Sequence, residues 1–156
     1  LDRNKVEIAS DRLRVDNAMY RGQDDKGRPF SLMAGQALQQ SVTVPVVRLS
    51  DLSARMLLDD GPAVLTAAGG SYDLESERVA VDGVVRFTAA DGYRMVTSGV
   101  SIDMPSRRVV GAGRVEGAIP AGTFSANRIE ADLSARTIAL TGNARLHMEP
   151  GKLRMP

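Results

Sequence analysis

Histidine and cysteine, which often do acid–base or metal chemistry, are almost absent from this chain, and its acidic residues are scattered. His147 is the only histidine among 156 residues. It stands beside Leu146 and Met148 in a strand-like segment, so we interpret it as an exposed strand residue rather than a catalytic base. The acidic pairs Asp24-Asp25 and Asp59-Asp60 could be glycosidase carboxylates or cation ligands. Each pair is soon followed by a glycine, however, where Asp commonly accepts hydrogen bonds from the backbone of its own turn. We therefore favour turns.

The glycine-rich segment 111–117 has only a superficial likeness to a dinucleotide-binding loop. Its glycine spacing differs by one residue, and Pro120 stands where a helix would have to hold the pyrophosphate. The sequence also lacks a P-loop, a nucleophile-elbow serine and any cysteine. We therefore expect no catalytic residue, no cofactor and no metal site, and predict that the protein is not an enzyme.

Composition limits the class of partner. The formal net charge is +1, aromatic residues make up 4% and tryptophan is absent. Nucleic-acid binders usually carry a basic surface with stacking aromatic side chains, so we predict no nucleic-acid partner.

Charges interrupt every apolar run before the roughly 18 residues that a membrane-spanning helix needs. Because the sequence starts at Leu1, we expect that an anchor or a signal upstream has been removed.

An aspartate followed ten residues later by a glycine recurs about every 30 residues. A fainter copy begins at Asp51, and residues 51–55 reappear letter for letter as residues 132–136. Such a period is typical of stacked structural units. We interpret the repeated aspartate as a turn or strand-end cap rather than as a calcium ligand. The three clear pairs are Asp73 and Gly83, Asp103 and Gly113, and Asp132 and Gly142.

Alternating apolar and polar residues predict strands along most of the chain. Residues 78–88 alternate clearly, and Gly83 inside them indicates a bulge or a bend. Residues 22–29 indicate a hairpin turn, and residues 117–122 indicate another. Residues 46–58 also fit a helical face, but we favour a strand that turns at residues 59–62 into a second strand. The predicted fold is all-β: a twisted sheet of two layers over a shared apolar interior.

The strands predict three parts. Residues 1–17 are a charged extension that could hold one edge strand, residues 18–149 form the β domain, and residues 150–156 form a loose tail. The inner face could be an ordinary packed core, or it could be a groove or open-ended tunnel for acyl chains, which aliphatic walls suit. Strand parity gives the candidate lipid-facing residues, which are Leu32, Val79, Val81, Val85, Phe87, Ile102, Phe124, Ile138, Leu140 and Leu146.

Several segments together resemble the LptC family of lipopolysaccharide export. The pattern Tyr20-x-Gly22-x-Asp24-x-x-Gly27-Arg28-Pro29-Phe30-x-Leu32-x-Ala34 is similar to the opening hairpin of that family. Residues 67–87 resemble its central repeat, and residues 97–103 with 107–110 resemble its next strand pair. The match covers roughly residues 18–145. Relatives such as LptA share the later repeats, whereas the opening hairpin favours LptC.

This resemblance implies a boat-shaped, OstA-like β-jellyroll in the periplasm that carries lipopolysaccharide by its acyl chains. It also implies an inner-membrane anchor upstream, the LptB, LptF and LptG transporter complex at the N-terminal edge, and an LptA-type bridge protein at the C-terminal edge. A homodimer through the sheet edges is a further expectation. Three alternatives stay open: an LptA-like soluble bridge, an adaptor that polymerises through its edges and binds no lipid, and a carbohydrate-active β enzyme.

Overall fold

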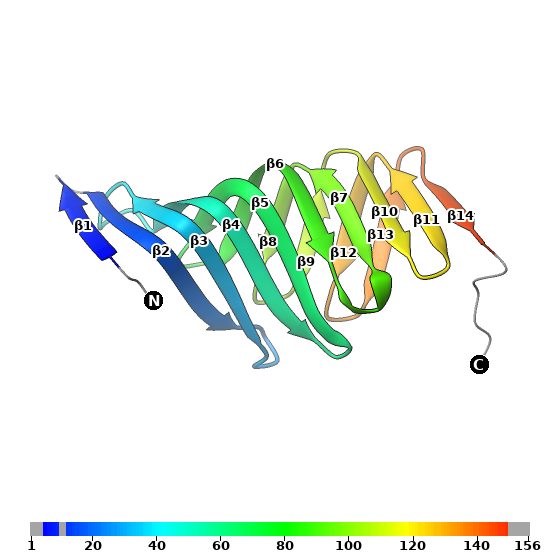
Figure 1. Ribbon diagram of the computed structural model, residues 1–156, viewed down its shortest axis with the longest axis horizontal. Coiled ribbons are helices and arrows are strands. Elements are labelled where there is room, and N and C mark those ends of the chain that lie inside the picture. The colour runs from blue at the N-terminus through cyan, green and yellow to red at the C-terminus, as the bar shows by residue number, and fades with distance from the viewer. Residues whose placement is uncertain (1–4, 10–11, 150–156) are drawn as a thin grey trace.

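The computed structural model describes residues 5–9 and 12–149, and in these residues the chain is built almost wholly of antiparallel strands (Figure 1). Ala90–Gly92 form a single 3-10 turn, η1, and no helix in the described ranges is long and apolar enough to cross a membrane. The strands are β1 (Lys5–Ala9), β2 (Arg12–Gln23), β3 (Pro29–Gln39), β4 (Val46–Leu58), β5 (Gly61–Asp73), β6 (Arg78–Thr88), β7 (Arg94–Ser98), β8 (Val100–Asp103), β9 (Arg108–Gly111), β10 (Val115–Ile119), β11 (Gly122–Ala126), β12 (Arg128–Asp132), β13 (Thr137–Thr141) and β14 (Arg145–Met148).

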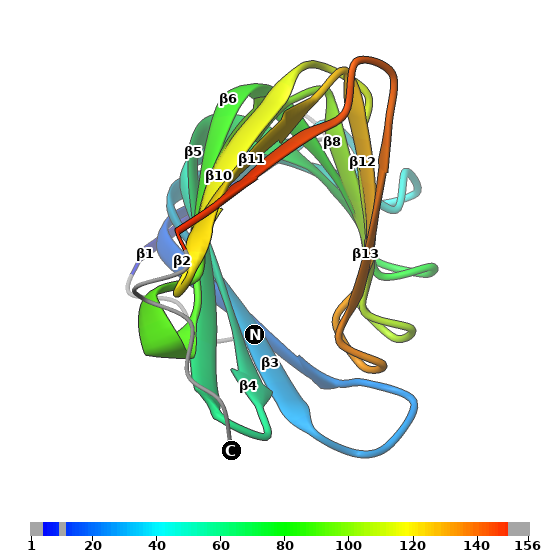
Figure 2. The same ribbon diagram turned by 90° about the vertical axis from the view of Figure 1, so that its right-hand side faces the viewer.

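Two facing layers arise because the strands bend. In β6, residues 78–80 pair with β8, whereas residues 84–88 pair with β7. The first layer holds β1, β8, β9, β12, β13 and the adjoining halves of β2 to β6. The second layer holds β7, β10, β11, β14 and the other halves. Figure 2, which looks along the long axis, shows the strands crossing from one layer to the other at its top. Each of β2 to β6 is therefore a V-shaped strand that contributes to both layers, whereas β7 to β14 each lie in one layer.

Residues with left-handed backbone conformation mark the bends. Gly83 has φ +66°, and a Cβ built on it would meet nothing within 4 Å. The backbone conformation, not a shortage of space, is therefore the reason for glycine there. The bend predicted at Gly83 is confirmed, and the β5–β6 ladder slips in register opposite it. Other bend residues with positive φ are Asn17, Asp51, Gly99, Gly142 and Asn143.

The repeated aspartate caps the turns of the first layer. Asp73 Oδ1 accepts hydrogen bonds from the N–H groups of Glu75 and Ser76, at 2.9 and 3.0 Å. Asp132 Oδ1 accepts the equivalent pair from Ser134 and Ala135, at 3.0 and 2.9 Å. The prediction of turn caps is confirmed at both positions, and the turns therefore repeat along the stack.

The third copy of this turn differs because Pro105 has no N–H to donate. Here the Ser106 hydroxyl donates to Asp103 instead. In all three turns the fourth residue after the aspartate has positive φ: +57° at Glu77, +61° at Arg107 and +59° at Arg136. These three side chains therefore leave the first layer from equivalent positions.

The faint copy at Asp51 has a different structure. Asp51 lies at the bend of β4 with φ +53°, whereas residues 132–136 close β12 and form its turn. The predicted strand, turn and strand over residues 46–73 are confirmed as β4 and β5. The helical alternative for residues 46–58 is wrong.

Two expected boundaries move. β2 runs from Arg12 to Gln23, so the division expected after residue 17 falls at a bend inside one strand, and β1 supplies the edge strand expected before it. The turn expected over residues 117–122 is shorter, because β10 continues to Ile119 and β11 starts at Gly122. The tail expected at residues 150–156 lies outside the described residues.

Candidate lipid-binding groove

All ten candidate lipid-facing residues lie on the inner face between the layers. Six are buried and Phe87 and Leu140 are partly buried, whereas Ile138 and Leu146 are 49% and 62% exposed. Strand register shows that the exposed ones also face inward, because Ile138 pairs with buried Ala131 and Leu146 pairs with buried Phe124. Contact with a lipid stays a prediction for all ten. The six buried residues are Leu32, Val79, Val81, Val85, Ile102 and Phe124.

The interior is closed along most of the stack and open at its C-terminal end. Leu32, Ile102 and Met104 have no exposed surface in the middle of the molecule. A smaller cluster, Val115, Phe124, Ala126 and Ile129, fills the interior near the end. Beyond it, β13 and β14 are the last described strands of their layers, so no described strand covers their inner side. The groove or open-ended tunnel expected from strand parity is therefore interrupted by a packed centre.

Two cavities adjoin this packed centre. One of about 240 Å³ lies near the N-terminal end, between Leu13, Val15 and Tyr20 on β2 and Val47 and neighbouring residues. The other, of about 120 Å³, lies between the two layers beside the start of β13. We call it the seam cavity; its walls are Leu58, Phe87, Ala89, Leu133 and Ile138, with Tyr93, Asp132, Arg136 and Thr137 around them.

The turns of the two layers meet along a line that we call the seam. It joins residues 104–107 and 133–136 of the first layer to residues 24–28 and 57–60 of the second. The Asp25 N–H donates a hydrogen bond of 2.7 Å to the Pro105 carbonyl across it. No described segment of the chain runs directly from one row of turns to the other. The side of the V opposite the bends is therefore held by non-covalent contacts alone.

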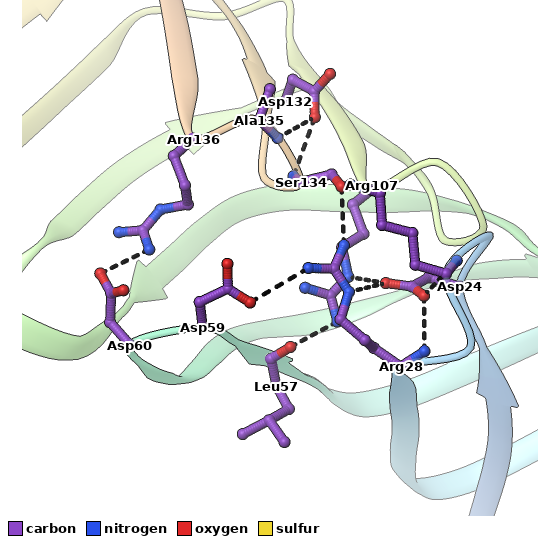
Figure 3. Close-up of polar contacts among 11 residues, drawn as sticks. Asp24, Arg28, Leu57, Asp59, Asp60, Arg107, Asp132, Ser134, Ala135 and Arg136 are labelled. Atoms are coloured by element: carbon purple, nitrogen blue, oxygen red, sulfur yellow. Dashed lines mark hydrogen bonds and ion pairs between the residues drawn. The ribbon is translucent and has the colours of Figure 1, made fainter.

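Arg107 crosses the seam and is buried, with 1% of its surface exposed. Its Nε lies 2.5 Å from Asp24 Oδ2, and its Nη2 donates to the Leu57 carbonyl at 2.6 Å (Figure 3). Burial lowers the pKa of Arg107, but the Asp24 charge opposes this effect, and an arginine in such a place stays protonated.

Two further arginines cross the seam beside it. Arg28 donates through Nε to Asp24 Oδ2 and through Nη2 to Ser134 Oγ, both at 2.8 Å. Arg136 pairs with Asp60 at 2.7 Å and lies over the Tyr93 ring at 5.8 Å. We call Arg28, Arg107 and Arg136 the seam arginines. Together they tie the two layers at the rim of the apolar interior (Figure 3).

Asp24 is the common partner of Arg28 and Arg107. Burial would raise the pKa of its carboxyl, but hydrogen bonds from the backbone and side chain of Arg28 and from the Lys26 N–H, with the charge of Arg107, hold the pKa below its ordinary value. The prediction that Asp24 caps its own turn is confirmed, since Oδ1 accepts the N–H groups of Lys26 and Arg28. Its role across the seam was not predicted from the sequence.

We expect stability to fall in acid partly through this carboxyl. A group with a pKa that folding lowers adds stability above its unfolded pKa and loses it as the pH falls through the folded value. The free energy of unfolding in urea should therefore hold from pH 7 to about 5 and fall below about pH 4. Asp24→Asn should show a weaker fall. The remaining loss of stability in acid should come from Asp73 and Asp132, because hydrogen bonds within their turns lower the pKa values of both carboxyls. An unchanged pH dependence in Asp24→Asn would contradict this assignment.

The other acidic and basic candidates from the sequence do not gather. His147 is exposed on β14, as predicted, and Asp59 is an exposed turn residue 3.6 Å from Arg28. In residues 5–9 and 12–149, no group of three or more His, Asp or Glu side chains is placed to hold a metal ion. The chemistry of this site is therefore apolar contact within a charged rim.

Comparison with known proteins identifies the architecture. No family model and no curated protein matches the sequence. Among solved structures, the crystal structure of LptH from Pseudomonas aeruginosa matches with a TM-score of 0.64 and 15% identity, over 81% of this chain and 99% of that one. The chain has the fold of LptH. That protein is described as the LptA-homologous periplasmic component of the conserved lipopolysaccharide transport device. The all-β, LptA-like jellyroll predicted from the sequence is thereby confirmed.

Proposed function

We propose that this protein is a non-enzymatic periplasmic carrier of lipopolysaccharide that holds acyl chains against its inner face. The observation that carries the proposal is the inner apolar surface left uncovered at the C-terminal end, where Ile138 is 49% and Leu146 62% exposed. A fold shared with a component of a lipopolysaccharide transport device supports the choice of cargo.

Burial of acyl chains provides enough free energy for such a carrier. Each buried methylene contributes about 0.8 kcal/mol, so a chain of a dozen carbons could contribute about 10 kcal/mol before the costs of ordering. The open end can accept the first part of a chain without disturbing the core. The packed centre, with Leu32 and Ile102 fully buried, must part for the chain to go further. A relay then needs a neighbouring groove of similar affinity.

Sheet edges at both ends of the stack could supply that neighbouring groove. Each of the terminal strands β1, β13 and β14 pairs with a single strand in the described part of the chain. An edge strand with free N–H and C=O groups can accept a strand from another protein. We propose that an LptA-type bridge protein joins the C-terminal edge, and that the LptB, LptF and LptG complex joins the N-terminal edge. A second copy of the chain could occupy the same edges.

Two roles in the export path are open to such a carrier. The opening hairpin around residues 20–34 supports an LptC-like role with an inner-membrane anchor. The likeness to LptH, an LptA homologue, supports an LptA-like bridge as the second candidate. The full gene separates them, because an uncleaved apolar helix ahead of Leu1 would favour the first, and a cleavable signal would favour the second.

Native mass spectrometry of the purified protein with lipopolysaccharide tests the proposal. We expect a complex of one protein with one glycolipid. Oligomers without any lipid adduct would instead support the edge-polymerising adaptor and contradict the carrier. A glycolipid that loses sugar mass during incubation would support the carbohydrate-active enzyme.

A further inference from the structure

We propose that the seam arginines form a binding site for the phosphate group of an anionic amphiphile, and that Asp24 occupies this site when no ligand is bound. The proposal rests on the proposed carrier function and adds a headgroup preference to it. It follows from an excess of buried donors over acceptors at the seam and from the apolar cavity beside them.

The acceptor capacity of Asp24 is fully used, because four donors face the roughly four lone-pair sites of its carboxylate. Its Oδ1 already accepts the N–H groups of Lys26 and Arg28, at 2.9 and 2.8 Å. Its Oδ2 alone faces both guanidinium groups, with Arg28 Nε at 2.8 Å and Arg107 Nε at 2.5 Å.

Arg107 is left with an unmet donor. Its Nη1 is buried and has no hydrogen-bond acceptor among the described residues, whereas its Nε is ion-paired with Asp24 Oδ2. Buried polar groups are nearly always paired, so this guanidinium can bind more acceptor oxygens than the carboxylate offers.

A phosphate group fits this deficit. It carries up to three strongly accepting oxygens, and arginine binds phosphate through two parallel N–H donors. Arg107 and Arg28 approach the same Asp24 oxygen from two turns, so one anion in its place could accept from both. Because Asp24 is a competing anion within the protein, the ligand must displace it, and a neutral headgroup cannot.

The seam cavity gives the ligand its apolar part. Its volume is about 120 Å³, and Leu58, Phe87, Leu133 and Ile138 supply its apolar walls. Arg136 and Tyr93 stand at the same cavity. Leu133 also donates its N–H to the Arg107 carbonyl, which links the wall of the cavity to the buried arginine. An apolar pocket lined by the guanidinium group of Arg136, with Arg107 one hydrogen bond from its wall, suits an alkyl chain with an anionic end.

Exchange of Asp24 for the ligand would also loosen the seam. Arg107 and Arg28 would turn from the Asp24 carboxylate to the ligand, and the ion pair between Arg107 and Asp24 across the layers would be lost. An anionic amphiphile would thereby help to separate the two layers at the seam. A neutral amphiphile would leave the ion pair between Arg107 and Asp24 intact.

Isothermal titration calorimetry with three probes tests the inference: dodecyl phosphate, dodecyl maltoside and inorganic phosphate, each detergent below its critical micelle concentration. We expect dodecyl phosphate to bind about tenfold more tightly than dodecyl maltoside, a difference in the range of one charged hydrogen-bonded pair. Inorganic phosphate should bind weakest, because it lacks the chain. The arginine Nε–H resonances of Arg28 and Arg107 should shift with dodecyl phosphate only.

Variants assign the preference to the seam. Arg136→Gln, at a side chain 33% exposed, and Arg107→Lys should each reduce the preference for the phosphate headgroup, measured as the ratio of the two dodecyl affinities in the same variant, at least threefold. Asp24→Asn should tighten dodecyl phosphate binding, because it removes the competing charge. Arg48→Gln is the matched control, since Arg48 pairs with Asp82 on the exposed surface away from the seam.

The outcomes separate this inference from the carrier function. Equal affinity for the two dodecyl ligands, or a preference that Arg136→Gln and Arg107→Lys both leave intact, would overturn the phosphate site and leave the carrier standing. Binding of inorganic phosphate as tight as that of dodecyl phosphate would overturn the amphiphile and show a site for free anions. Failure of both dodecyl ligands to bind would count against the carrier and the phosphate site together.

Discussion

Arg107→Met is expected to lower the free energy of unfolding by about 3–5 kcal/mol, the range found when one partner of a buried ion pair is removed. Among the described residues, the variant leaves buried Asp24 with Arg28 as its one remaining cationic partner, and it leaves the Leu57 carbonyl without its 2.6 Å hydrogen bond. Methionine keeps most of the side-chain volume, so the loss reports on charge and hydrogen bonding. Equilibrium unfolding in urea measures it.

Arg48→Met is the control for this loss. Its ion pair with Asp82 is half exposed, so we expect a change within about 0.5 kcal/mol. Adding Asp24→Asn to Arg107→Met should recover part of the loss, because the uncompensated charge is then gone. If Arg107→Met were as mild as Arg48→Met, the seam would not be held by this pair.

Aspartate substitutions on the inner face are expected to divide into two classes. Val81 is buried in the packed centre, so Val81→Asp should cost more than about 4 kcal/mol and leave the chain largely unfolded. Ile138 is half exposed at the open end, so Ile138→Asp should fold normally and yet bind lipopolysaccharide at least about tenfold more weakly, because a charge then faces the acyl chain. Circular dichroism and titration with lipopolysaccharide measure the two effects.

Val84→Asp is the matched control for Ile138→Asp. Val84 is 58% exposed on the outer face of β6, so the two substitutions place the same charge at similar exposure on opposite faces. Equal binding by these two variants would contradict a lipid site at the open end. A folded Val81→Asp protein would show that the centre is less tightly packed than its burial indicates.

Local patterns in the sequence predicted the strands and their faces, because alternation depends only on which side of a strand is buried. In β6, buried Val79, Val81 and Val85 lie on the predicted face, and Gly83 lies at the predicted bend. The repeated aspartates were likewise recognised as caps, since the capping hydrogen bonds are made within the same turn.

Features that depend on how the layers meet could not be predicted in this way. Parity places Val81 and Ile138 on the same face, but only the stacking of the strands shows that one is buried and the other exposed. Arg107 was missed because its partners Asp24 and Leu57 belong to turns of the other layer, far away in sequence. The available signal was its position: Arg107 follows Asp103 as Arg136 follows Asp132, and both cross the seam.

The identical residues 51–55 and 132–136 show the same limit. The first copy continues along β4 because both neighbouring strands pair with it, whereas the second leaves β12 and turns. Pairing with other strands decides between the two structures, and five residues do not carry that information.

Photocrosslinking along the two last strands tests most directly whether the inner face holds acyl chains. A photoreactive amino acid would replace, one at a time, Ile138, Ala139, Leu140, Arg145, Leu146 and His147, and each protein would be irradiated with lipopolysaccharide. We expect adducts at Ile138, Leu140 and Leu146, which face inward, and few or none at Ala139, Arg145 and His147. Equal labelling of both sets, or labelling of the outward set alone, would contradict the carrier.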